Sequence, residues 1–276
     1  TTLTIRFAPT ASGPKSAVLQ IANNDADESP FDVRLSSLTD HEIQTGIISS
    51  ILAGNVDFTK TGAGSATLAG ANTFNGTATI TGGILTLGGT PGGNNALPTN
   101  GTAGDNDIFI NGGSLQIGGS EQIGNNAGIV LTTGSFGFSG SGLTETIGTF
   151  TNNGGTFSTG ANTLIGTGNT ITWAAGTNTI NAGGTLVDTH YSVTGGTNTV
   201  QGGATRGTLH VQGGGLGLEF DGTASPTITL NSDAAQAGRI LLEGNVNVLA
   251  GLTSGTAQIL NGGVAANSGF IDMNGG

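Results

Sequence analysis

The sequence contains no cysteine and few charged side chains: six of its 276 residues are Lys or Arg and 17 are Asp or Glu. Without cysteine, neither a disulfide framework nor a thiolate metal site can form. The net charge of −11 opposes nucleic-acid binding, which depends on basic side chains that displace phosphate counterions. Glycine interrupts every apolar run before about 18 residues, so no transmembrane segment is expected. No basic and then apolar leader is visible, so we expect any secretion signal to lie outside this chain.

Aromatic residues are also scarce at 5%, whereas glycine is abundant, with 53 residues. The hydrophobic fraction of 35% and the mean hydropathy of +0.07 argue against a disordered, glycine-rich linker. β-Branched and aromatic residues recur at regular intervals with Thr and Asn between them. We therefore predict a folded all-β chain.

Charge density divides the chain into two parts. Residues 1–45 hold three basic and six acidic side chains, whereas the remaining residues hold three basic and eleven acidic ones. Such a change in charge density indicates a domain boundary. We predict one domain over residues 1–45 and a second over residues 46–276.

The first domain shows apolar residues that alternate with polar ones in three short runs, which is typical of antiparallel strands. The alternating residues are Leu3, Ile5 and Phe7, then Ala17, Leu19 and Ile21, then Phe31, Val33 and Leu35. Residues 7–13, 17–21 and 24–31 resemble the closing strands of an Ig-like domain of the choice-of-anchor-D type, related to the ASPM/SPD-2/Hydin sandwiches. The resemblance covers about residues 1–39 and implies a partial Ig-like β-sandwich. A complete sandwich needs about seven strands, so either the domain is truncated or strands from elsewhere complete it.

The second domain repeats one pattern: a short alternating strand, then Gly-Gly or Asn-Gly, then another strand. Residues 78–89, 108–119, 178–187 and 208–218 are examples. An antiparallel barrel or sandwich would use these glycines in hairpin turns. A parallel β-helix would use them as corners within one coil. The short strands and the frequent recurrence favour the β-helix, with a narrow core of Ile, Leu, Val and Ala and with ladders of Thr and Asn on its outside.

Residues 59–76, followed by 77–87, closely resemble the autotransporter-associated β-strand repeat, with a match across about residues 47–89. This resemblance implies a right-handed parallel β-helix in the passenger region of a secreted bacterial protein, located extracellularly or on the cell surface. The family carries no catalytic residues, so the resemblance implies no enzyme activity and no cofactor.

Two clusters of acidic residues are weak candidates for calcium binding, because hard cations prefer carboxylate oxygens. Asp25, Asp27 and Glu28 lie in one predicted turn, and the alternative is a solvated hairpin tip. Asp105 and Asp107 resemble half of a calcium-binding β-roll repeat, but a tandem copy is lacking, so a loop turn is the alternative. Residues 90–107 are predicted to form a loop that projects from the coils.

Catalysis would need clustered carboxylates with a basic partner, as in the pectate lyases and polygalacturonases built on parallel β-helices. One coil of about 22 residues would place Asp188 over His210 and would direct His190 toward Gln212. Alternation predicts instead that His210 points outward as a solvated residue, and that Glu219 does the same. The other residues considered for this role are Asp221 and Arg206. We therefore expect that this chain is not an enzyme.

The sequence thus predicts a structural and interaction protein: part of an extracellular fibre or surface stalk. Because the chain begins within a sandwich and stops where another strand is expected, we expect end-to-end self-association into filaments. Two alternatives stay open. One is a β-helix that binds or cleaves polysaccharide, to which Trp173 and Tyr191 could contribute sugar-stacking rings instead of packing. The other is an adhesin that uses the 90–107 loop or the Thr/Asn faces against a cell-surface partner.

Overall fold

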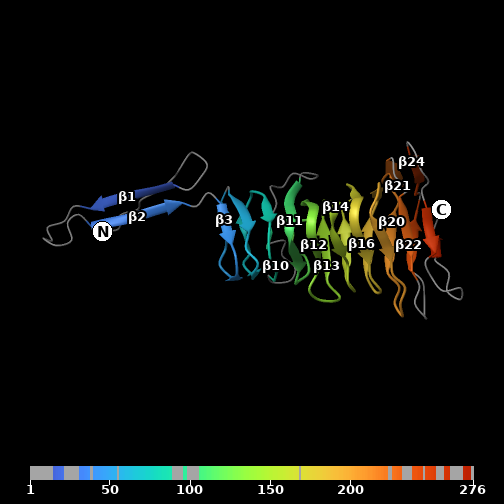
Figure 1. Ribbon diagram of the computed structural model, residues 1–276, viewed down its shortest axis with the longest axis horizontal. Helices are drawn as coiled ribbons and strands as arrows, with labels where there is room; N and C mark the ends of the chain where they lie inside the picture. The colour runs from blue at the N-terminus through green and yellow to red at the C-terminus, as the bar shows by residue number, and fades with distance from the viewer. Residues whose placement is uncertain are drawn as a thin grey trace. The chain divides into compact units, whose positions relative to one another are not determined.

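The computed structural model is built from β-strands, with no helix in the part of the chain that it describes: residues 15–21, 31–37, 40–54, 56–88, 96–97, 106–167, 169–222, 226–231, 238–244, 246–252, 258–261 and 270–274. The chain divides into two compact units, Thr1–His41 and Glu42–Gly276. Figure 1 shows the strands of the second unit stacked side by side in chain order.

The first unit contains a hairpin of β1 (Lys15–Ile21) and β2 (Phe31–Ser37). The two strands are antiparallel, with Lys15 opposite Ser37 and Ile21 opposite Phe31. This pairing confirms the antiparallel arrangement predicted for two of the three strands. The predicted strand around Leu3 lies outside the described residues, and the Ig-like character of this unit stays a prediction.

The second unit winds through three faces. The first face is a ladder of β3 (Asp40–Ile43), β6 (Asp57–Lys60), β9 (Ala78–Ile80), β11 (Asn106–Ile117), β12 (Gly128–Phe138), β14 (Thr149–Ser158), β16 (Ile171–Ile180), β18 (His190–Val193), β21 (Gly217–Gly222) and β24 (Val248–Leu252). The second face is a ladder of β4 (Gly46–Ile48), β7 (Ser65–Leu68), β10 (Ile84–Leu87), the second halves of β11, β12, β14 and β16, then β19 (Thr197–Val200), β22 (Thr227–Leu230) and β25 (Gln258–Asn261). The third face is a sheet of β13 (Thr144–Ile147), β15 (Thr163–Gly166), β17 (Thr185–Asp188), β20 (Thr208–Gln212), β23 (Arg239–Glu243) and β26 (Phe270–Asn274). A separate pair joins β5 (Ala53–Gly54) and β8 (Thr73–Phe74).

The described pairs within this second unit are parallel, including long ladders such as β11–β12, β12–β14 and β14–β16. The unit is therefore a parallel β-solenoid, which confirms the β-helix prediction and excludes the antiparallel barrel or sandwich. The right-handed sense of winding stays a prediction.

Glycine forms corners between the first and second faces, as the sequence pattern predicts. Gly134 has φ +90°, and a Cβ there would lie 2.0 Å from the carbonyl oxygen of Gly113 in the preceding coil. Gly176 has φ +73°, and its Cβ would lie 2.2 Å from the carbonyl oxygen of Gly155. Both positions need positive φ and leave no room for a side chain, so only glycine fits.

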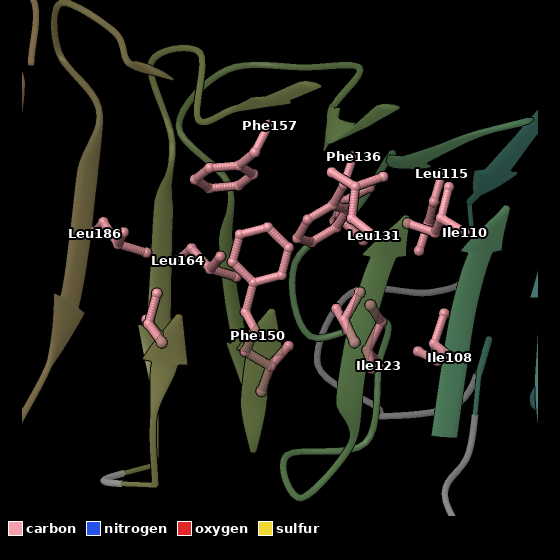
Figure 2. Packing of buried hydrophobic residues seen from close by; sticks show 14 of the residues in the cluster. Ile108, Ile110, Leu115, Ile123, Leu131, Phe136, Phe150, Phe157, Leu164 and Leu186 are labelled. Carbon is pink, nitrogen blue, oxygen red and sulfur yellow. The ribbon is translucent and has the colours of Figure 1, made fainter. Parts of the chain in front are cut away.

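The interior is apolar and continuous along the coils, as Figure 2 shows for its central part. It is not the purely aliphatic core that the sequence suggested. Phe136, Phe150 and Phe157 pack together with ring centroids 4.8–5.5 Å apart. Trp173 and Tyr191 are each 1% exposed and contact edge to face at 6.5 Å. Burying both rings supports their packing role and leaves neither available to stack against a sugar.

Side chains of one type recur in rows across neighbouring coils. The outer side of the second face carries a row of hydroxyls at Ser114, Ser135, Thr156, Thr177 and Thr197, which are register partners in successive strands. The third face carries what we term the threonine row, at Thr144, Thr163, Thr185 and Thr208. The outward threonine ladders that we predicted are therefore present, although Thr208, next to Arg239, is only 5% exposed.

The asparagine ladder lies inside the solenoid, which corrects the predicted outer position. Asn152, Asn178 and Asn198 are buried. Asn152 Nδ2 donates to Asn178 Oδ1 at 2.9 Å, and Asn178 Nδ2 donates to Asn198 Oδ1 at 2.8 Å. Because each amide both donates and accepts, a buried row can satisfy its own polar atoms.

Candidate functional site

One cluster of ionisable side chains lies on the first face. His190 on β18 approaches Glu219 on the neighbouring β21, with Nε2 and Oε2 3.2 Å apart. The other ring nitrogen, Nδ1, lies 2.9 Å from Thr170 Oγ1. The side chains of His190 and Glu219 are 13% and 22% exposed, so the pair lies in the surface layer and not in an enclosed cavity.

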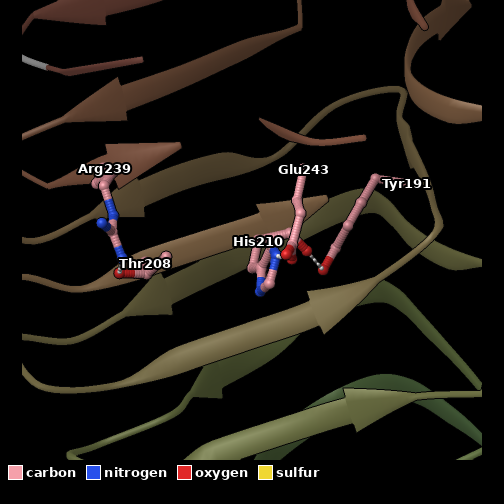
Figure 3. A network of polar contacts seen from close by, with 5 residues as sticks. All are labelled: Tyr191, Thr208, His210, Arg239 and Glu243. Carbon is pink, nitrogen blue, oxygen red and sulfur yellow. Dashed lines mark hydrogen bonds and ion pairs between the residues drawn. The ribbon is translucent and has the colours of Figure 1, made fainter. Parts of the chain in front are cut away.

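A second pair lies on the third face (Figure 3). His210 Nε2 on β20 is 2.7 Å from Glu243 Oε2 on β23. The Tyr191 hydroxyl donates to the main-chain carbonyl of His210 at 3.0 Å. Burial raises the pKa of the Tyr191 phenol, and the nearby charge of Asp188 raises it further, so this group stays a neutral donor. The pair lies beside a surface groove of about 500 Å³ lined by Gln212, Gly213, Gly214, Glu243 and Gly244.

The catalytic arrangement considered from the sequence is not formed. Asp188 lies opposite Val211 and not over His210, and His190 lies opposite Gly217 and not toward Gln212. The register differs from the predicted one by a single residue at Asp188, and a single residue reverses the side that a side chain faces.

The side chains considered for catalysis are accordingly divided between the interior of the solenoid and the outer sides of two faces. Asp188 is 1% exposed, and its Oδ1 accepts from the Thr189 amide at 2.6 Å. His210 and Glu219 point outward, as alternation predicts, and Asp221 is half-buried on the outer side of β21. An acid and a base that flank a scissile bond must face the same substrate. Asp188 and the outward carboxylates do not meet that requirement.

Of the weak calcium candidates, the structure describes only Asp107, because Asp25, Asp27, Glu28 and Asp105 lie outside the described residues. Asp107 belongs to β11, is 2% exposed, and accepts from the Gly128 amide through Oδ2 at 3.2 Å. Across the described ranges, no three His, Asp or Glu side chains gather into a group that could hold a metal ion. Of the predicted 90–107 loop, the structure describes only Ala96, Leu97 and the start of β11. Leu97 is buried and pairs with Ile123 in an isolated bridge.

Sequence reasoning missed two buried ionisable residues that join neighbouring coils. Glu145 is buried and accepts from the amides of Gln122 and Ile123, each at 2.8 Å. Burial raises the pKa of Glu145 to about 8, because desolvation outweighs the two hydrogen bonds, which lower it; the charge of Glu121 adds to the increase. Alternation alone could have found this residue, since Glu145 stands in phase with the inward Ile147.

Lys60 is the second buried ionisable residue. Its Nζ donates to the carbonyl oxygens of Thr61, Gly62 and Gly82, at 2.6, 3.1 and 2.9 Å. Desolvation lowers the pKa of Lys60. Since Gly82 belongs to the next coil, Lys60 ties two corners together and acts as a structural clamp.

The comparisons with known proteins give no relative: no protein-family model, no curated protein and no solved structure matches the chain. Within the described residues, no helix has the length and the apolar character needed to cross a bilayer.

Proposed function

We propose that this chain is a structural segment of an extracellular bacterial protein, serving as part of a fibre or surface stalk. The resemblance of residues 47–89 to the autotransporter-associated β-strand repeat supports this proposal, together with a right-handed winding and a surface location. The resemblance of residues 1–39 to the choice-of-anchor-D Ig-like domain adds a second module of the same extracellular type.

The observation that carries the proposal is the unbroken parallel pairing from coil to coil. Main-chain hydrogen bonds join each strand to the next along the solenoid axis, so cohesion accumulates from nearest neighbours. Side chains reinforce the same contacts: Lys60, Asn178 and Glu145 each bond to a neighbouring coil. An element built in this way keeps its shape without a ligand and suits a spacer function.

The composition of the outer surface favours a passive mechanical role for the solenoid. One row of Ser and Thr hydroxyls runs along the second face and another along the third, and only 8% of all residues are charged. Stacked like charges on neighbouring strands would repel one another, and their scarcity favours close stacking of the coils.

Surface labelling of the source bacterium tests the proposal. Antibodies against residues 42–276 should label intact cells, and added protease should remove that label without lysis. Deleting the gene should remove the labelled surface structure in electron micrographs. Labelling only after permeabilisation, with no loss from protease-treated intact cells, would contradict the proposal.

Head-to-tail association is the more specific form of this proposal, because a parallel ladder can be extended in the same register by another copy. Sedimentation velocity over a wide concentration range should show a growing series of oligomers, and electron micrographs should show continuous fibres. A single monomeric species at the highest concentration would exclude filament formation while leaving the stalk function intact.

Polysaccharide cleavage and adhesion are the competing functions. Cleavage is tested by incubating acidic and neutral polysaccharides with the wild-type chain and with Asp188→Ala/Asp221→Ala. Turnover that the double variant abolishes would support an enzyme, and its absence would favour the stalk. An adhesin function through residues 90–107 predicts that deleting this segment abolishes attachment to host or bacterial cells.

A further inference from the structure

Three polar side chains on the first face form one hydrogen-bonded chain across three neighbouring coils. Thr170 directly precedes β16, His190 begins β18, and Glu219 lies on β21. Thr170 Oγ1 is 2.9 Å from His190 Nδ1, and Glu219 Oε2 is 3.2 Å from His190 Nε2. Both ring nitrogens of His190 therefore have a partner, with a hydroxyl on one side of the ring and a carboxylate on the other.

The register of the parallel strands brings these three side chains together. The buried residues that follow Thr170 and His190 are register partners, so Thr170 and His190 project outward side by side. His190 itself pairs with Gly217 on the following coil. Because glycine has no side chain, Glu219 can reach the imidazole diagonally from two residues further along β21.

The carboxylate of Glu219 determines which ring nitrogen of His190 carries the proton when the imidazole is neutral. An ionised carboxylate only accepts hydrogen bonds, so the nitrogen that faces it, Nε2, is the donor. The other nitrogen, Nδ1, is then an acceptor, and Thr170 Oγ1 donates to it. A hydroxyl that donates to a base, which a carboxylate in turn orients, is the arrangement of an activated nucleophile.

The pair of His210 and Glu243 on the third face has the same geometry without the hydroxyl. In both pairs the glutamate lies on the following coil, two residues beyond the register partner of the histidine. His210 Nε2 is 2.7 Å from Glu243 Oε2, but among the described residues no hydroxyl side chain bonds to the other ring nitrogen of His210. Thr170 therefore distinguishes the cluster on the first face, and His210 provides a matched control.

Acyl transfer to a hydroxyl also needs a donor for the negative charge that develops on the carbonyl oxygen of the substrate. Asn169 directly precedes Thr170, and its Nδ2 is 3.5 Å from both the Gly148 carbonyl oxygen and Thr167 Oγ1. Hydrogen bonds of this length are weak, so the Asn169 amide can donate to an oxyanion instead. The cluster lies in the surface layer, so an ester group carried on an extended polymer can approach it from the side of the solenoid.

We propose that Thr170, His190 and Glu219 form a catalytic triad that hydrolyses acyl esters, with Thr170 as nucleophile, His190 as general base and Glu219 as the group that orients the ring. Oγ1 attacks the ester carbonyl carbon while its proton passes to Nδ1, and the tetrahedral adduct then expels the alcohol, which leaves with that proton. Water attacks the acyl-threonine with Nδ1 again as base, which releases the acid and restores the hydroxyl. This activity goes beyond the stalk function and departs from the expectation that the chain is not an enzyme.

Hydrolysis of p-nitrophenyl acetate by the full chain tests the proposal. We expect release of nitrophenolate, and a peptide map of acid-quenched protein should show one acetyl group on Thr170. Thr170→Val should abolish the acetyl label and, like His190→Gln, lower the rate by about a hundredfold or more, because the nucleophile or its base is lost. Glu219→Gln should lower the rate by about tenfold or more, because an amide does not fix the proton on Nε2. His210→Gln should react like the wild type.

Three results would overturn the proposal. The first is no hydrolysis by the wild type above the rate in buffer. The second is an equal rate for Thr170→Val, which would mean that an imidazole reacts directly with the ester and that Thr170 and His190 form only a structural hydrogen bond. The third is an acetyl group on a residue other than Thr170. Thr170→Ser keeps a hydroxyl and should retain the label, and thermal melting followed by circular dichroism checks that the coils of each variant are intact.

Discussion

At the scale of single residues, the solenoid uses a few buried polar groups to join coils whose main contacts are apolar. Glu145 and Lys60 are both fully buried, and each one satisfies main-chain groups in a neighbouring coil. A buried charge is costly without such partners, because desolvation penalises the ionised form. The stability of the contacts between coils therefore depends on the protonation of Glu145 and on the hydrogen bonds of Lys60.

Glu145 should make the stability of the solenoid fall as the pH rises. Its pKa is about 8 in the folded chain and 4.5 ordinarily, so between these values the unfolded chain loses a proton that the folded chain keeps. The free energy of unfolding should then decrease across this interval, by up to about 5 kcal/mol. Urea unfolding at pH 5 and pH 8.5 measures the change.

Glu145→Gln provides the control for this prediction. Its amide does not titrate, so the contribution from residue 145 should vanish. Since the Gln NH₂ faces a backbone donor, the variant should be less stable than wild type at pH 5, and the gap should narrow at pH 8.5. A gap that stays constant between the two pH values would show that the pKa of Glu145 is the same in the folded and the unfolded chain, which contradicts the prediction.

Lys60→Met should destabilise the solenoid by about 2–4 kcal/mol, because three carbonyl oxygens lose their shared donor. Relief of the desolvated charge offsets part of the loss. Chemical denaturation followed by circular dichroism measures the effect. Lys15→Met makes the same change on β1, in the other compact unit, and should leave the solenoid transition unchanged. Equal transitions for the two variants would mean that the Lys60 clamp contributes nothing.

At the scale of the structural element, a coil consists of short strands and glycine corners, and its corners tolerate less change than its strands. Gly134→Ala should cost about 3 kcal/mol or more, since it combines positive φ with a Cβ 2.0 Å from the Gly113 carbonyl oxygen. Gly142→Ala is the matched control: φ is +71°, but no atom lies within 4 Å of the added Cβ. Strain alone should cost about 1 kcal/mol there. Similar melting temperatures for the two variants would show that the corner relaxes to accept a methyl group.

The sequence could predict these elements but not their register. Alternation identifies inward residues such as Leu186 and Leu209, and paired glycines identify corners, because both signals are local. Register depends on the length of each coil, which varies: Ile171 pairs with Tyr191 after 20 residues, whereas Leu218 pairs with Val248 after 30. A uniform coil therefore placed Asp188 over His210, one residue away from its real partner.

The position of the asparagine row was predicted wrongly, because the row lies inside the solenoid. The inner asparagine row did leave a signal, since Thr177-Asn178-Thr179 and Thr197-Asn198-Thr199 repeat the same order. Asparagine is usually exposed, so its polarity suggested the outer side, whereas alternation with Ile180 and Val200 correctly indicates the interior.

At the scale of the whole solenoid, nearest-neighbour cohesion implies that one complete coil can be removed. Deleting residues 150–170 joins Thr149 to Ile171, and it keeps register because Ile129 pairs with Phe150 and Phe150 pairs with Ile171. On the third face, β13 would then meet β17, since Thr144, Thr163 and Thr185 share one register.

We expect this shortened chain to fold with a β-rich circular dichroism spectrum and to melt within about 10 °C of wild type, because only one interface and its aromatic contacts are lost. Deleting residues 150–159 removes half a coil and should abolish the cooperative transition, because the faces that follow would no longer meet their partners. Thermal melting of the two deletions, alongside wild type, decides between them. If both deletions behave alike, the coils are not interchangeable units, and the stability of the solenoid depends on features specific to each coil.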